Sequence, residues 1–196
     1  MNITVILGLT GTVIGLVRAM PQLFRILRSR KALGVSIDTA LTSAIVSAGW
    51  AIYGFLTQQP YVTLATGASA AVFFVITLYA LKFGRRIKEL RIAPVWFFAL
   101  LVAFLAGKEA GLGMILPVSI LVSNIPQIYV AAREENLSDL SLGTWILSMS
   151  DGFVWGFYSV FEQDYAIMVF AIFQLVTSGT IVFFKLLNQK KCGAET

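Results

Sequence analysis

The residues best suited to contact a small polar molecule form a pattern that occurs twice. Trp50 and Tyr53 are followed 105 residues later by Trp155 and Tyr158. A flat aromatic ring beside hydroxyl groups suits a ligand with a polar and an apolar face, such as a sugar ring. The alternative is an interfacial aromatic belt, but both tryptophans lie about two turns inside their predicted helices, which favours a pocket. The hydroxyl side chains that precede them at nearly helical spacing are Thr39, Ser43, Thr144 and Ser148.

Two charged residues, Arg18 and Asp151, lie within otherwise apolar stretches. A charge near the centre of a bilayer costs about 2.5 to 3.5 kcal/mol on insertion scales, so each side chain should face a cavity or a partner. Three interpretations stay open: a structural ion pair, a proton-coupling role for Asp151 beside a cation, and an anion-binding role for Arg18. Gln22, one turn after Arg18, indicates further polar surroundings.

A Pro-Gln dipeptide also occurs twice, as Pro21-Gln22 and Pro126-Gln127. Proline removes a helix hydrogen bond, so two prolines at equivalent depth predict hinges that open and close a gate. The alternative is a pair of static kinks, since proline is frequent in membrane helices. We expect each glutamine amide to hydrogen-bond to a neighbouring helix, either as a structural contact or as part of the gate.

Two further polar residues, Thr66 and Gln174, complete the predicted substrate-binding set. The sequence has no histidine and a single cysteine, Cys192, which excludes an intramolecular disulfide. It shows neither paired carboxylates nor a nucleophile beside a base. We therefore expect neither an enzyme nor a metal site nor a cofactor. Other polar positions in these stretches are Thr63, Ser69, Thr177 and Ser178.

The elements that position these residues must be membrane helices. Of the 196 residues, 58% are hydrophobic and 13% are charged, which is more apolar surface than a soluble domain of this size can bury. Stretches of about 20 apolar residues are long enough to cross a bilayer. Seven are predicted: Ile3–Leu27, Ile37–Leu56, Val62–Leu81, Ala93–Ala106, Leu112–Ala131, Leu142–Phe161 and Ala166–Leu187.

The formal net charge of +5 is explained by where the basic residues lie, so no nucleic-acid partner is needed. In a path of seven spans, nearly all basic segments fall on one side of the membrane, and the other side holds Lys108. The positive-inside rule makes the basic side cytoplasmic, which predicts an external N-terminus and a cytoplasmic C-terminus. The basic segments are Arg25 to Lys31, Lys82 to Arg91, Arg133, and Lys185 to Lys191.

The 105-residue offset extends over much of the chain and predicts an internal repeat of three helices. Because three crossings invert a chain, the odd fourth span restores its direction, and the two copies become parallel. We expect a first repeat over residues 1–83, a basic loop and linker helix over 84–109, a second repeat over 110–188 and a cytoplasmic tail over 189–196. The identities are Pro21/Pro126, Gln22/Gln127, Ser36/Ser141, Thr39/Thr144, Ser43/Ser148, Trp50/Trp155 and Tyr53/Tyr158.

The Pro-Gln helix, the basic loop, the Gly34-Val35-Ser36 and Leu140-Ser141 segments and the Trp-x-x-Tyr pattern together resemble the PQ-loop superfamily. That superfamily includes the SWEET and SemiSWEET sugar transporters and cystinosin-like amino-acid exporters. The resemblance covers nearly the whole chain and implies an all-α integral membrane fold of two parallel three-helix bundles joined by a linker helix. It also implies transport, with Pro-Gln helices that bend. The chain departs from the SWEET pattern at Asp151, where asparagine is usual, and at Thr66 and Phe170, which align with sugar-binding asparagines.

These observations together favour a transporter that moves a small polar solute, with a sugar first, by alternating access through a cavity between the bundles. A proton-coupled amino-acid or organic-ion transporter is the second hypothesis, and a non-transporting receptor or accessory protein on the same fold is the third. The expected partners are the solute, the lipid bilayer and other copies of the chain in a homo-oligomer. The expected location is the plasma membrane or a bacterial inner membrane.

Overall fold

The computed structural model of the protein describes residues 2–32, 36–133 and 142–194. The chain divides into two compact units, Met1–Leu116 and Pro117–Thr196, and each is described by itself. The described residues are helical in all their regular elements. The segments Gly34-Val35 and Leu140-Ser141, which contributed to the predicted resemblance, lie outside the described residues.

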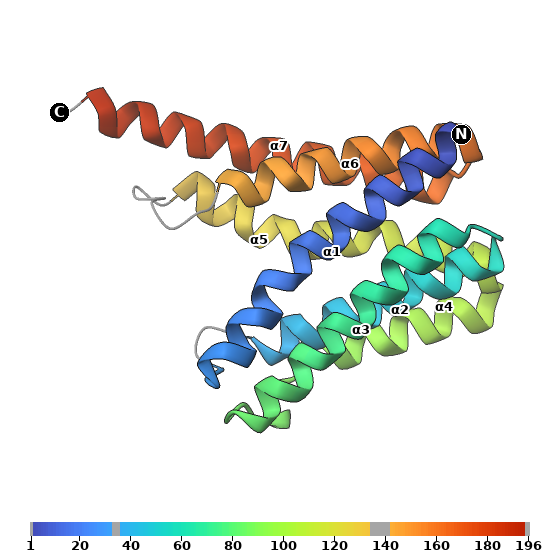
Figure 1. The fold of residues 1–196 in the computed structure, drawn as a ribbon, viewed down its shortest axis with the longest axis horizontal. Coiled ribbons are helices and arrows are strands. Elements are labelled where there is room, and N and C mark those ends of the chain that lie inside the picture. Colours follow the sequence, from blue (N-terminus) through green and yellow to red (C-terminus); the bar gives the residue numbers. More distant parts are fainter. Residues whose placement is uncertain (1, 33–35, 134–141, 195–196) are drawn as a thin grey trace. The chain divides into compact units, whose positions relative to one another are not determined.

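In the first unit, α3 occupies the central position, because it packs against both α1 and α2 (Figure 1). The next long helix, α4, packs against α2. The elements are α1 (Ile3–Ser29), α2 (Ile37–Leu56), α3 (Pro60–Lys82), the 3-10 helix η1 (Ile87–Glu89) and α4 (Ile92–Ile115).

The second unit repeats this arrangement with α7 in the central position, packed against α5 and α6. A 3-10 turn, η2 (Leu116–Val118), precedes α5 (Ser119–Arg133), and α6 (Leu142–Glu162) and α7 (Tyr165–Ala194) follow. The last helix extends seven residues beyond the predicted end at Leu187. The added segment is polar but contains good helix formers and no proline, so helical geometry continues past the apolar part.

Five stretches of the described residues are long and apolar enough to cross a membrane, whereas the sequence predicted seven spans. The stretch Ile92–Arg133 contains both α4 and α5. The helix α6 is not among the five, and it contains several hydroxyl side chains and Asp151. The five stretches are Ile3–Ser29, Ile37–Leu56, Pro60–Lys82, Ile92–Arg133 and Tyr165–Leu187.

A break within α4 separates the predicted fourth and fifth spans. Helical geometry is lost at Gly107 (φ −155°, ψ 19°) and Lys108 (φ 43°, ψ −121°), directly after the predicted end of the fourth span at Ala106. A Cβ atom at Gly111 would overlap the carbonyl oxygen of Ala103, so the chain folds back closely on itself and requires glycine there. Before this break, α4 exposes an apolar stripe suited to lipid: Val95, Phe98, Val102 and Leu105.

The side of α4 that faces α2 is held by a carboxylate. The Asp38 side chain, in the first turn of α2, accepts hydrogen bonds from the backbone N–H groups of Arg91, Ile92 and Ala93 at 2.9 to 3.0 Å. These amides lie at the start of α4, where helix N–H groups have no partner within the helix. Asp38 therefore caps α4 from another helix and ties α4 to α2.

The run of small residues from Gly67 to Ala71 in α3 lies between two neighbouring helices, where small side chains allow close packing. A Cβ atom on Gly67 would meet the Ala51 side chain of α2 at 3.8 Å. On the other side, the Ser69 hydroxyl lies 3.8 Å from the position of a Cβ atom on Gly15 of α1. Small side chains therefore bring α1 and α2 close to α3.

The 105-residue offset also relates the hydrophobic cores of the two units. Both cores gather near the C-terminal ends of the first and third helices of their unit. Each residue of the second cluster lies 105 positions after a residue of the first, although no pair but one is identical. The repeat is therefore one of packing positions as well as of motifs. The pairs are Leu23/Ile128, Ile26/Ala131, Ala40/Trp145, Ile76/Ile181 and Tyr79/Phe184.

The turns that follow α2 and α6 are equivalent at the same offset. Gln58 (φ 59°) and Gln163 (φ 55°) both adopt the left-handed conformation. In the first turn the backbone N–H group of Gln59 donates to the Gly54 carbonyl at 2.7 Å. In the second turn the backbone N–H group of Asp164 donates to the Ser159 carbonyl at 3.0 Å. This is the geometry of a Schellman motif, which closes the helix and starts the return helix.

Candidate functional site

A group of buried polar residues lies inside the second unit, on its three long helices. We call it the polar cluster. Each of its members exposes 6% of its surface or less, and all three helices of the unit contribute. Buried polar groups are costly in a membrane helix unless they are bonded or used. The members are Asn124 on α5, Ser148 on α6, and Gln174, Thr177 and Ser178 on α7.

Hydrogen bonds join the polar cluster across the helices. The Asn124 Nδ2 group donates to Thr177 Oγ1 at 2.7 Å, which links α5 to α7. The Thr177 hydroxyl itself donates to the Phe173 carbonyl at 2.7 Å. The Gln174 Nε2 group donates to the Ser148 carbonyl at 3.2 Å, which links α7 to α6. These hydrogen bonds therefore join α7 to both α5 and α6.

Two atoms of the polar cluster keep hydrogen-bonding capacity. Among the described residues, neither Gln174 Oε1 nor Ser178 Oγ has a hydrogen-bond partner, and both atoms are buried. An unmade hydrogen bond at a buried atom costs about 1 to 3 kcal/mol. A solute hydroxyl could donate to Gln174 Oε1, and another could accept from Ser178. The pair suits a neutral, hydroxyl-bearing molecule.

Close packing holds Gln174 against α6. A Cβ atom on Gly152 would lie 3.1 Å from Gln174 Cγ and 3.0 Å from Leu175 Cγ. One turn later, a Cβ atom on Gly156 would lie 3.4 Å from Ala171 Cβ. This small-x-x-x-small spacing lets α6 and α7 approach closely, and it fixes the stem of Gln174 beside the Ser148 carbonyl.

The residues predicted on α6 share a buried surface. Ser148, Asp151, Trp155 and Tyr158 are spaced by three or four residues, and each is at most 8% exposed. The two rings meet edge to face, with centroids 5.2 Å apart and planes at 76°. Side chains of an interfacial belt would be exposed to lipid headgroups, whereas these are buried.

The first unit contains the same aromatic pair. The Trp50 and Tyr53 rings lie 5.5 Å apart at 86°, and they are 6% and 7% exposed. Thr39, predicted on the same polar face, instead takes part in a helix cap, because its amide and its hydroxyl both donate to Ser36 Oγ at 3.2 and 3.1 Å. Thr39 therefore belongs to the helix cap, and the aromatic pair repeats without it.

The first unit does not repeat the polar cluster. At the positions 105 residues earlier, most cluster members and Asp151 are replaced by apolar side chains. Thr66, predicted to bind substrate, donates its hydroxyl to the Val62 carbonyl of its own helix at 2.6 Å. The first unit therefore has apolar side chains at most positions equivalent to the polar cluster. The replacements are Ala19 for Asn124, Val46 for Asp151, Val72 for Thr177 and Phe73 for Ser178, while Ser43 and Ser69 stand for Ser148 and Gln174.

The predicted hinge residues lie inside long helices. The helix α1 continues through Pro21 and Gln22 to Ser29, and α5 continues through Pro126 and Gln127 to Arg133. The Gln22 side chain is exposed and the Gln127 side chain is half-buried. Arg18 lies on α1 in the first unit, whereas Asp151 lies in the second. The hinge role and the Arg18–Asp151 pair remain predictions.

Sequence reasoning missed Asn124. It stands two residues before Pro126 in a predicted span, and an amide inside an apolar stretch is the same signal that drew attention to Gln22 and Gln127. The 105-residue repeat did not indicate it, because the equivalent residue in the first half, Ala19, is not polar. A search for polar residues in each span by itself would have found it.

No protein-family model and no curated protein sequence matches this chain. Its fold is similar to that of a solved structure, a eukaryotic SWEET transporter, with a TM-score of 0.76 and 14% sequence identity. The similarity covers 96% of this chain and 97% of the other. At this identity the likeness concerns the fold. Together with the long apolar helices, it identifies the chain as a multi-pass integral membrane protein with a SWEET-like fold.

Proposed function

We propose that the protein transports a small polar solute across a membrane by alternating access. The observation that carries the proposal is the polar cluster of α5, α6 and α7, buried among apolar helices of a SWEET-like fold. A purely structural core would not need two buried atoms, Gln174 Oε1 and Ser178 Oγ, without partners among the described residues. A transporter needs such atoms for its solute.

A sugar is the first candidate solute. The amide and hydroxyl groups of the polar cluster are neutral and can both donate and accept, which suits the hydroxyl groups of a sugar. Aromatic rings pack well against the apolar face of a sugar ring, and the buried Trp155–Tyr158 pair lies on the helix that carries Ser148. We assign substrate contact to Asp151, Trp155, Tyr158 and Gln174, together with Trp50, Tyr53 and Thr66 of the first unit.

A proton-coupled amino-acid or organic-ion transporter is the second candidate. Asp151 favours it, because this carboxyl group is 5% exposed and lies within one turn of both Ser148 and Trp155. An acidic residue inside a membrane segment commonly marks a proton or ion pathway. In this case Arg18 would contribute the cation or bind an anionic solute.

The proposed topology follows the sequence. Seven spans in a 3+1+3 order, with the repeats over residues 1–83 and 110–188, place the N-terminus outside and the basic loops in the cytoplasm. A linker over residues 84–109 joins the repeats, and residues 189–196 form the tail. Single cysteines introduced at the exposed residues Lys88 and Lys108 would react with an impermeant reagent from opposite sides of the membrane.

The function is tested by uptake into proteoliposomes that contain the purified protein. A panel of labelled neutral sugars, amino acids and organic anions is offered with and without an imposed pH gradient. If the protein is a sugar facilitator, its rate of sugar uptake does not respond to the pH gradient, either in wild type or in Asp151→Asn. A proton-coupled carrier responds to the gradient, and Asp151→Asn abolishes that response.

The contact role is tested by comparing Trp155→Ala with Phe97→Ala. Phe97 is 50% exposed on α4 and Trp155 is 8% exposed, so the control removes a ring from a surface suited to lipid. We expect the Trp155 variant to weaken solute binding at least about tenfold, in line with an aromatic contact and its buried area. Equal uptake and equal ligand protection in both variants would assign the ring to packing. Uptake of no solute in the panel would favour the receptor or accessory role.

A further inference from the structure

A basic pocket lies at one end of the first unit, where α1 and α3 both end. It has a volume of about 280 Å³, and none of its lining residues belongs to the polar cluster. Three of its lining side chains are cationic and one is acidic. The lining residues are Arg30, Lys31, Ala32, Phe83, Gly84, Arg85 and Glu89.

The segment that supplies two of the cations is held in a defined conformation. Arg30 adopts the left-handed conformation at the end of α1 (φ 50°), which turns the chain away from the helix. The Ser29 hydroxyl donates to the Lys31 carbonyl at 3.2 Å, and the Lys31 amide donates to Ser29 Oγ at 3.3 Å. The next residue, Ala32, is buried in the core of the unit. Arg30 and Lys31 are thus presented from a fixed turn.

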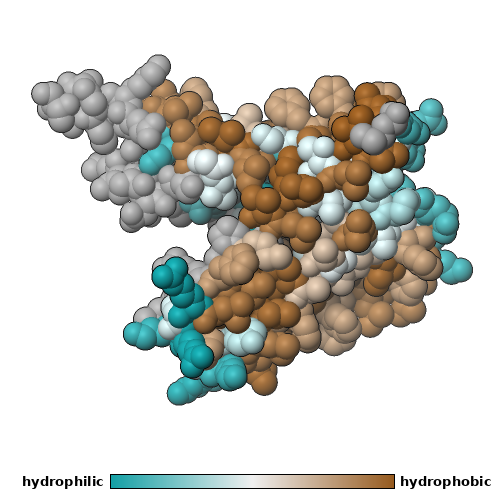
Figure 2. All heavy atoms as spheres, in the orientation of Figure 1, coloured by the Kyte–Doolittle hydropathy of each residue, from teal (hydrophilic) through white to brown (hydrophobic). Residues whose placement is uncertain are grey.

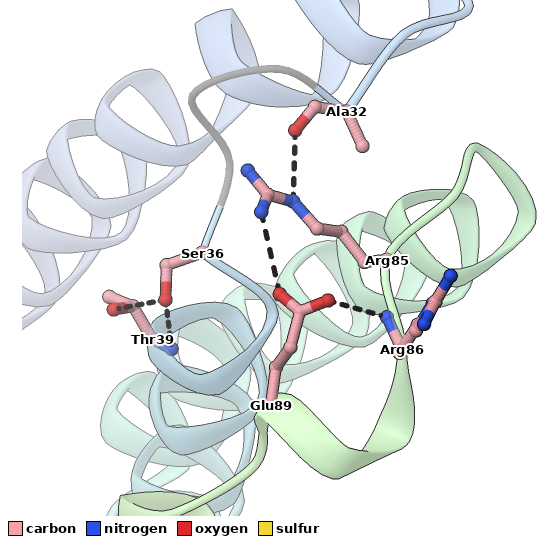
Figure 3. A network of polar contacts seen from close by, with 6 residues as sticks. All are labelled: Ala32, Ser36, Thr39, Arg85, Arg86 and Glu89. Carbon is pink, nitrogen blue, oxygen red and sulfur yellow. Dashed lines mark hydrogen bonds and ion pairs between the residues drawn. The ribbon is translucent and has the colours of Figure 1, made fainter.

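Arg85 closes the other side of the pocket. Its Nε group donates to the Ala32 carbonyl at 3.2 Å, and its Nη1 group pairs with Glu89 Oε2 at 3.4 Å (Figure 3). The other oxygen of Glu89 accepts from the Arg86 amide at 2.8 Å. Two of the five N–H donors of Arg85 are used in these contacts with described residues, so donors remain for an anion.

The residues around the pocket combine positive charge with an exposed apolar side chain. Ile87, on η1, is 70% exposed and stands between the exposed residues Arg86 and Lys88. In Figure 2, hydrophilic atoms gather at the end of the unit where α1 and α3 end, and apolar atoms cover the helix sides. An apolar side chain flanked by cations suits the boundary between headgroups and acyl chains.

We propose that this pocket binds a phosphate group, with Arg30, Lys31 and Arg85 as its ligands. Three cations, one of them the held guanidinium of Arg85, match the charge and the acceptor geometry of a phosphate. The phosphate can belong to the headgroup of an anionic lipid or to a free phosphate-bearing solute. Basic pockets between the helices of membrane proteins hold lipid headgroups in this manner, and the exposed Ile87 favours the lipid source.

The test measures binding to the full-length protein in a neutral detergent, by native mass spectrometry and by thermal stability. Three probes are added separately: phosphatidylglycerol, phosphatidylcholine and inorganic phosphate. Retention of phosphatidylglycerol with a raised melting temperature supports the site and a lipid source. The same stabilisation by inorganic phosphate supports the site and a soluble source. Equal retention of both lipids without any effect of phosphate overturns the proposal.

A matched pair of double variants separates the pocket from general surface charge. Arg30→Gln with Lys31→Gln removes two positive charges that line the pocket, whereas Arg28→Gln with Lys108→Gln removes two from exposed residues outside its lining. We expect the first pair to weaken phosphatidylglycerol binding about tenfold or more, and the second less than about threefold. Equal loss in both pairs would mean that the lipid responds to net charge alone, and the site would be rejected.

Glu89→Gln tests whether the pocket binds an anion, because this change removes the only negative charge among the lining residues. The amide oxygen of glutamine can still accept from the Arg86 amide, while the negative charge beside Arg85 is removed. A phosphate site should then bind about threefold more tightly or better, and unchanged or weaker binding by the folded variant would contradict it. The phosphate site and the transport function are tested separately. Uptake by the wild-type protein in neutral lipid measures transport in the absence of any phosphate probe.

Discussion

At the scale of single residues, Thr177 shows how the polar cluster differs from ordinary hydroxyl groups in membrane helices. Many hydroxyl groups in this protein donate to the carbonyl four residues earlier and are satisfied within their own helix. Thr177 does the same with Phe173 but also accepts from Asn124 on another helix. Thr180, three residues later, donates to the Val176 carbonyl at 2.8 Å and is half-buried. The two threonines therefore form a natural comparison.

Replacing Thr177 by valine should lower both stability and uptake, because Asn124 loses its acceptor while the shape is kept. Hydrogen bonds between membrane helices contribute on average about 0.6 kcal/mol and at most about 1.7 kcal/mol, so the melting temperature should fall by a few degrees. Thr180→Val should change neither quantity. Melting in detergent and initial uptake rates would show the difference, and indistinguishable behaviour of the two variants would remove the special role of the Asn124–Thr177 contact.

At the scale of helices, some helix ends are stabilised by neighbouring residues and others by residues far away in the sequence. The turns after α2 and α6 are local, because Gln58 and Gln163 adopt the left-handed conformation and close their own helices. The start of α4 is capped from more than 50 residues away, by Asp38 of α2. Both kinds of end determine how the next helix returns along its neighbour.

The Asp38 cap should contribute measurably to the stability of the first unit. Asp38→Ala leaves three amides at the start of α4 without their acceptor, and loss of a helix cap costs about 0.5 to 2 kcal/mol. Asp38→Asn keeps one oxygen acceptor and should lose less. Thermal unfolding followed by circular dichroism would rank wild type above the asparagine variant and the alanine variant last. An alanine variant as stable as wild type would show that water or lipid replaces the cap.

At each of the two left-handed glutamines, Gln58 and Gln163, glycine should raise the free energy of unfolding and valine should lower it. Residues with a Cβ atom are strained in this conformation by about 1 kcal/mol or more, and glycine is not. We therefore expect Gln163→Gly to raise the free energy of unfolding by up to about 1 kcal/mol, and Gln163→Val to lower it. The same order should hold at Gln58, the equivalent turn. A glycine variant that is less stable than the valine variant at either site would contradict the assigned geometry.

At the scale of the whole molecule, the two units share a framework but not a chemistry. Their cores use equivalent positions, and their aromatic pairs have nearly the same geometry. The polar cluster belongs to the second unit alone among the described residues, because the first has apolar side chains at most of the same positions. The shared framework includes the Pro-Gln helices, α1 and α5, which we propose as the moving parts.

Replacing Pro21 or Pro126 by alanine should leave a folded protein that exchanges solute more slowly. Alanine restores a backbone N–H group and removes a ring that costs about 3 kcal/mol in a helix interior, so each helix should stiffen. Pro94 provides the control, because it lies exposed in the first turn of α4, where proline is well tolerated. Exchange rates in proteoliposomes would reveal a hinge if they fall for the two interior prolines and not for Pro94→Ala. Rates equal to wild type in both would remove the hinge role.

The sequence by itself determined the features that depend on local composition and on periodicity. The limits of α2, α3 and α6 agree with prediction to within a few residues, because long apolar stretches bounded by polar turns leave little freedom. The break after Ala106 was also predicted, since Gly107 and Lys108 interrupt an apolar run. The repeat and its aromatic pairs followed from identical residues at one offset.

Only the tertiary structure decided which polar residues meet. Asn124 and Thr177 are 53 residues apart, and Arg85 reaches the carbonyl of Ala32 over the same separation. Such pairs leave no periodic signal, because the geometry of helix packing sets them and the sequence spacing does not. For the same reason Thr39 was predicted on a binding surface, whereas the structure uses it at a helix cap. Hydroxyl and amide groups can serve in caps and in contacts between helices, and the fold determines which of them does which.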